Sequence, residues 1–87
     1  MFKITDGKGF HIKLDNGWTV SVQWGRGNYS DNYTVKTGEF YEQRNPESNT
    51  AEVWSWNRDD TKQYPDNPIG YAKPDEVVDF INKVRSM

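Results

Sequence analysis

Alternating apolar and polar residues on either side of one turn signal place the strongest constraint on the fold. Residues 10–14 and 18–24 carry an apolar side chain at every second position. A period of two is typical of β-strands with one buried face. Asp15-Asn16-Gly17 lies between the two runs, and Gly readily adopts the positive φ of a tight turn. The sequence therefore predicts a β-hairpin.

The length of the hairpin loop decides which residues share a face. A two-residue Asn16-Gly17 loop would pair Leu14 with Thr19 and mix apolar and polar side chains on one face. A three-residue loop, with Gly17 in the left-handed conformation closing a bulge, keeps one face apolar. We predict this second register, whose pairs are Leu14 with Trp18, Ile12 with Val20, and Phe10 with Val22.

Three further segments favour strands. Residues 2–4 form a short candidate strand ahead of the turn signal at 6–9, and residues 50–56 have high strand propensity. The polar segment 57–60 favours a turn after them, with a further short strand near 62–64. After Pro65 and Pro68 the pattern becomes helical.

The C-terminal segment, about residues 74–86, predicts a helix. Pro74 suits the first helical position, and the acidic residues that follow it complement the positive end of the helix dipole. Lys83 and Arg85 complement the negative end. The core-facing stripe at three- and four-residue spacing consists of Val77, Val78, Phe80, Ile81 and Val84.

The chain is short and aromatic-rich, which limits it to one small domain, residues 1–87. Of its 87 residues Leu14 is the single leucine, whereas there are 4 Trp, 5 Tyr and 4 Phe. Each buried aromatic ring removes about 150–250 Å² from water, so few large side chains can form the core. We predict an α+β domain: an antiparallel sheet of about four strands with the C-terminal helix packed on its apolar face.

Composition disfavours most catalytic chemistry and several partners. With 0 Cys and 1 His, the chain offers no thiol nucleophile and no multi-histidine metal site. No catalytic constellation is visible, and we predict a non-enzymatic protein without cofactor or metal. The net charge of −2, with scattered cations, disfavours duplex DNA as a partner. No apolar run reaches the roughly 18 residues that span a bilayer, and no signal peptide is visible, so we expect a cytoplasmic protein that binds no membrane. We expect it to be a monomer or a weak homodimer.

The segment from residue 25 to 49 holds the first candidate site. Its opening part combines glycines with a cation, an aromatic ring and amides, a mixture found where a backbone approaches a partner. The alternative is that these residues only build a turn. The rest is either a functional loop or conceals an edge strand at 33–36 and 39–41. The candidate partner-binding residues here are Arg26, Asn28, Tyr29, Asp31 and Asn32.

Trp54 and Trp56 form the second candidate site. If Ala51 and Val53 face the core, alternation sends both tryptophans to the opposite face, which one helix cannot cover. Large aromatic residues on an open face favour a partner surface. The alternative is a second small core beneath the 25–49 segment. For His11, on the same polar face, we predict a solvated strand histidine and not a general base.

The sequence resembles a group of small uncharacterised proteins encoded by bacteriophages and prophages. The resemblance lies in residues 9–12, in Asn16-Gly17-Trp18-Thr19-Val20-Ser21-Val22-Gln23-Trp24-Gly25 with Gly27-Asn28-Tyr29, and in residues 51–53 and 74–77. It implies a phage accessory protein that acts in the host cytoplasm. Small phage proteins commonly act by binding, so the resemblance suggests an inhibitor of a host defence complex, such as a CRISPR effector or a toxin.

Two functions therefore remain open. The first is binding of a host protein or protein complex. The second is binding of single-stranded nucleic acid or a nucleotide, in which Tyr29, Trp54 or Trp56 stacks on bases and Arg26 or Arg44 contacts phosphate.

Overall fold

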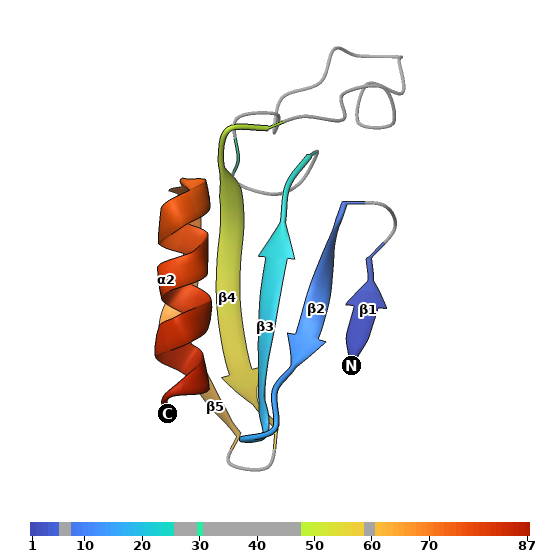
Figure 1. The fold of residues 1–87 in the computed structure, drawn as a ribbon, viewed down its shortest axis with the longest axis vertical. Coiled ribbons are helices and arrows are strands. Elements are labelled where there is room, and N and C mark those ends of the chain that lie inside the picture. The colour runs from blue at the N-terminus through green and yellow to red at the C-terminus, as the bar shows by residue number, and fades with distance from the viewer. Residues whose placement is uncertain (6–7, 26–29, 31–47, 59–60) are drawn as a thin grey trace.

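A computed structural model describes residues 1–5, 8–25, 30, 48–58 and 61–87. Five strands form one antiparallel sheet in the order β1-β2-β3-β4-β5, so each strand pairs with the next one described along the chain (Figure 1). The strands are β1 (Phe2–Ile4), β2 (Gly9–Lys13), β3 (Trp18–Gln23), β4 (Ala51–Asn57) and β5 (Lys62–Ala72), followed by helix α2 (Pro74–Arg85). The α+β prediction is confirmed, with five strands in the sheet.

The β2–β3 hairpin has the predicted register. Ile12 pairs with Val20 and Phe10 with Val22. The Leu14 N–H donates to the Trp18 carbonyl at 2.8 Å, which closes the three-residue loop. Gly17 lies at φ +90°, in the left-handed region that favours glycine.

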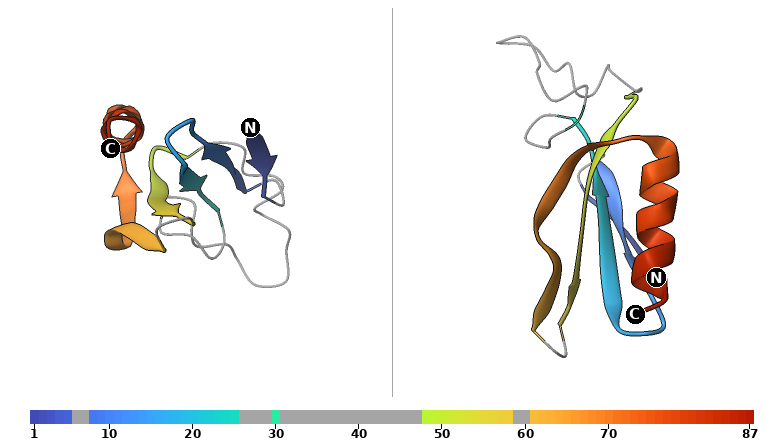
Figure 2. Two further views of the ribbon diagram at one scale, coloured as in Figure 1. Left: turned by 90° about the horizontal axis from the view of Figure 1, so that it is seen from below. Right: turned by 90° about the vertical axis from the view of Figure 1, so that its left-hand side faces the viewer.

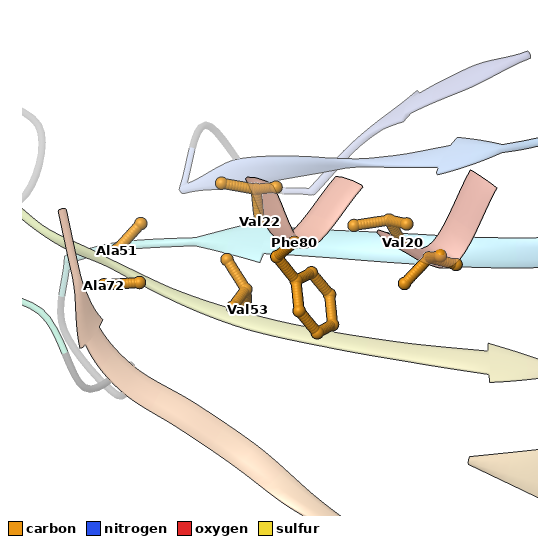
Figure 3. Close-up of a cluster of buried hydrophobic side chains, with 7 residues drawn as sticks. Val20, Val22, Ala51, Val53, Ala72 and Phe80 are labelled. Carbon is orange, nitrogen blue, oxygen red and sulfur yellow. The ribbon is translucent and has the colours of Figure 1, made fainter. Parts of the chain in front are cut away.

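Helix α2 lies along one side of the sheet only, against β3 and β4 (Figure 2). Phe80 and Val84 are its buried residues, and Val77 and Ile81 are half-buried against the core. The prediction that Val78 also faces the core was wrong, because it is 55% exposed: one position after Val77, it lies about 100° further round the helix, away from the sheet. Phe80 stacks on Tyr64 of β5, with ring centroids 5.9 Å apart and planes 11° apart. The buried apolar cluster beneath the helix consists of Val20, Val22, Ala51, Val53, Ala72, Phe80 and Val84 (Figure 3).

One side chain ties the hairpin loop to the end of the helix. The Asn16 side-chain amide donates to the carbonyls of Val84 at 2.9 Å and Arg85 at 3.2 Å, while its oxygen accepts from the Trp18 N–H at 3.1 Å. The last carbonyls of a helix have no partner within the helix, so Asn16 satisfies two of them. The loop and the helix C-terminus therefore fix each other's position.

The prediction of a short strand near 62–64 was wrong in length, because β5 runs through both prolines to Ala72. Val53 pairs with Ile69 and Ser55 with Tyr64, so a bulge lies between these pairs and contains Pro65 and Pro68. Proline cannot donate to the neighbouring strand, and it is tolerated at bulges and in the last strand of a sheet. Because the bulge takes up both prolines, β5 resumes pairing after them.

Candidate functional site: a basic and aromatic hollow on the sheet

The sheet face opposite α2 carries the polar residues of the alternating strands. Cross-strand pairing places Lys3, His11, Ser21 and Trp54 in one row from β1 to β4. Lys13, Thr19 and Trp56 form the next row from β2 to β4. Trp54 and Trp56 therefore face away from the helix, as predicted. Both are half-buried.

Three aromatic rings meet on this face. The His11 and Trp56 rings lie edge to face, with centroids 5.0 Å apart and planes 88° apart. They come from strands separated by β3, and the small Ser21 and Thr19 side chains between them leave room for this contact. The Trp54 and Trp56 centroids are 5.8 Å apart. The rings therefore form one connected cluster across β2, β3 and β4.

The two tryptophans have different surroundings. The Trp54 indole N–H donates to the Pro65 carbonyl at 2.7 Å, which attaches Trp54 to the bulge of β5. The Trp56 indole N–H has no acceptor among the residues that the structure describes. Trp56 is thus the tryptophan with a donor available to a ligand, whereas Trp54 holds its neighbours in place.

A hollow of about 270 Å³ opens beside Trp56. Its described lining residues are Met1, Lys3, His11, Lys13, Gly17, Thr19, Trp56 and Arg58. The three charged side chains, Lys3, Lys13 and Arg58, are exposed, and no carboxylate occurs among the lining residues described. Asp75, Glu76 and Asp79 belong to α2, on the other side of the sheet, and Glu52, on the same face as Trp54, is not among the lining residues. The hollow is therefore locally cationic although the chain carries a net charge of −2.

His11 is half-buried in this hollow, whereas we predicted a histidine surrounded by solvent. Its ring packs against Trp56, and Lys3 pairs with it from β1. Burial, and to a smaller degree the positive charge of Lys3, lowers the pKa of His11 below its usual value of 6.5. The free imidazole is therefore mainly neutral at pH 7, able both to donate and to accept a hydrogen bond.

The remaining predicted site residues lie outside the described part of the chain. These are Arg26, Asn28, Tyr29, Asp31 and Asn32, as well as Arg44 and the suggested edge strand at 33–36 and 39–41. Between residues 26 and 47 only Ser30 is described; it is buried, and its hydroxyl accepts from the Gly25 N–H at 3.1 Å. The question of a second core beneath residues 25–49 also falls outside the described residues.

Sequence reasoning missed the cations of the hollow. Lys3, Lys13 and Arg58 are far apart in the sequence and look scattered. Only the cross-strand register brings them to one face, and the predicted hairpin register already placed Lys13 on the same side as His11. Extended to β1 and β4, the same register also places Lys3 and Trp56 on this face, and that was the signal available in the sequence.

A second hollow, of about 620 Å³, lies on the helix side of the sheet. Its described lining residues are Phe10, Val22, Trp24, Ser48, Asn49, Thr50, Ala51, Ala72, Pro74 and Val77, none of which is charged. It borders the apolar core and offers no group suited to an ion. The basic hollow is therefore the better candidate for a site with specific chemistry.

Several kinds of chemistry have no support in the described residues. They contain no group of three or more His, Cys, Asp or Glu side chains able to hold a metal ion. None of the helices in the described ranges has both the length and the apolar character to cross a bilayer. Comparisons with protein-family models, curated proteins and solved structures gave no match. The fold and the site define a small α+β module with a basic, aromatic sheet face.

Proposed function

We propose that this protein is a non-enzymatic module that binds single-stranded nucleic acid through the sheet face opposite α2. The observation that carries the proposal is the grouping of Lys3, Lys13 and Arg58 around the half-buried ring of Trp56. Proteins that bind single strands combine cations that follow the phosphates with aromatic rings on which bases stack. Each stacked base contributes about 1–3 kcal/mol.

The size of the hollow supports a strand that lies across the face. Its volume of about 270 Å³ is below the roughly 300–1,000 Å³ of pockets that enclose drug-sized ligands. An open site of this size suits one base with its neighbouring phosphate. In a duplex the faces of the bases are covered by stacking, so an unpaired base is the better match for Trp56.

The resemblance to phage proteins suggests where such a module would act. A phage accessory protein in the host cytoplasm meets single-stranded intermediates of replication, transcription and defence. The binding site consists of Trp56 with Lys3, Lys13 and Arg58, and binding does not require Arg26, Tyr29 or Arg44.

A host protein is the second candidate partner, and a separate surface favours it. Helix α2 does not cover β1, where Phe2 is 71% exposed and Ile4 78% exposed. Exposed apolar side chains beside an open strand edge are common in protein interfaces. An inhibitor of a host defence complex, such as a CRISPR effector or a toxin, would use this edge, which presents Phe2 and Ile4 on the helix side of the sheet.

Tryptophan fluorescence tests the primary proposal. At low salt, a short oligothymidylate should quench the emission in a saturable way, because a base stacks on Trp56. Lys13→Gln and Arg58→Gln should each weaken binding by at least about fivefold, because a hydrogen bond to a charged group contributes about 1.5–3 kcal/mol when well formed. Both side chains are exposed, so their removal should leave the melting temperature unchanged.

Arg85→Gln provides the matched control. It removes the same charge from an exposed position on α2, on the other side of the sheet, and should leave binding unchanged. Absence of quenching below 50 mM salt with intact folded protein would contradict the proposal and leave the host protein as the candidate partner.

A further inference from the structure

His11 lines the same hollow as Lys3, Lys13 and Arg58. His11 is the single histidine of the chain. On the sheet it pairs with Lys3 of β1 and Ser21 of β3. Its ring edge contacts Trp56 at a centroid distance of 5.0 Å. A base stacked on Trp56 would therefore bring its phosphate close to the imidazole.

The groups that face His11 come from every strand packed around it. Lys3 projects from β1, Lys13 from its own strand, and Arg58 follows β4, while β3 contributes the uncharged Thr19 and Ser21. Among the described residues that line the hollow there is no carboxylate. No described group there stabilises a second proton on the ring, and three cationic side chains and the amino group of Met1 oppose it.

We infer that His11 takes up a proton when the sheet face binds a phosphate, so that binding of single strands is tighter at acidic than at neutral pH. This inference rests on the proposed function. A phosphodiester brings a negative charge that offsets Lys3, Lys13 and Arg58 and can accept a hydrogen bond from the imidazolium. The ligand thus supplies a counter-charge that none of the described lining residues provides.

The direction of the pH effect follows from linkage. Burial and Lys3 hold the pKa of His11 below 6.5 in the free protein, and the bound phosphate raises it. Affinity is constant above the pKa of the complex, rises as the pH falls between the two pKa values, and levels off below that of the free protein. One proton allows at most about a tenfold change in affinity per pH unit.

Two measurements on the intact chain test this inference. The ring C–H resonances of His11, unambiguous because the chain has 1 histidine, give its pKa by NMR titration without and with a saturating octathymidylate that lacks a terminal phosphate. The phosphodiesters of this probe stay ionised over the whole range. We expect the pKa to rise by about one unit or more on binding, and the fluorescence affinity to increase about tenfold over the same pH interval.

Controls separate this inference from the proposed function. All titrations are run at one ionic strength, and thymidine, which lacks phosphate, should leave the pKa of His11 unchanged. His11→Gln should remove the dependence of affinity on pH, whatever its absolute affinity. Binding with an unshifted pKa in the wild-type protein would overturn the inference and leave the proposed function standing. No binding at any pH between 5 and 8 would overturn both.

Discussion

Gly17 carries the backbone conformation that the β2–β3 loop requires. Its φ of +90° is strongly disfavoured for a β-branched residue. We expect Gly17→Val to destabilise the domain by about 1–3 kcal/mol, which corresponds to a fall in melting temperature of roughly 4–8 °C for each kcal/mol. Thermal unfolding followed by circular dichroism measures this change.

Asp15→Ala is the matched control in the same loop. Asp15 is exposed, and its replacement should change the melting temperature far less. If Gly17→Val melted within a degree or two of the wild type, the left-handed loop residue would not be required and the register of the hairpin would be in doubt. Asn16 depends on this loop too, since it reaches the helix C-terminus only from this geometry.

At the scale of whole elements, the docking of α2 on the sheet is the contact with the largest expected effect on stability. Phe80 is 7% exposed and stacks on Tyr64. Phe80→Ala should reduce the free energy of unfolding by about 3–5 kcal/mol, a large part of the stability of a domain of this size. Urea denaturation monitored by tryptophan fluorescence gives the value.

The same helix contains its own comparison. Val78 is 55% exposed, so Val78→Ala should cost much less than Phe80→Ala. Equal effects of the two substitutions would mean that the helix does not pack through its Phe80 face.

Elements defined by residues close together in the sequence were predictable. Elements defined by pairing with a strand elsewhere in the chain were less so. The helix was predictable from its proline start, its terminal charges and its apolar stripe, and the hairpin from Gly17 and the alternation. The full length of β5 was not, because Pro65 and Pro68 usually end a strand. Only the bulge opposite β4 shows how both prolines are accommodated.

At the scale of the whole molecule, the candidate site depends on four strands, β1 to β4, taking one common register. Trp54 and Trp56 could be assigned to the open face from their own strand alone. The cations around Trp56 could not, because Lys3, Lys13 and Arg58 reach the same hollow from segments far apart in the chain. The net charge of −2 disfavours a polyanionic partner. Composition does not show, however, how the charges are distributed over opposite faces of the sheet.

The salt dependence of binding distinguishes this local charge from the net charge of the chain. Three phosphate contacts on a single strand predict that log K falls against log salt with a slope of about −2. Lys3→Gln should flatten the slope by about 0.7. Arg85→Gln changes the net charge of −2 by the same amount but lies on α2, so its slope should equal that of the wild type. Equal flattening by both variants, in fluorescence titrations from 20 to 200 mM KCl, would mean that the hollow holds no phosphate and that only the overall charge acts.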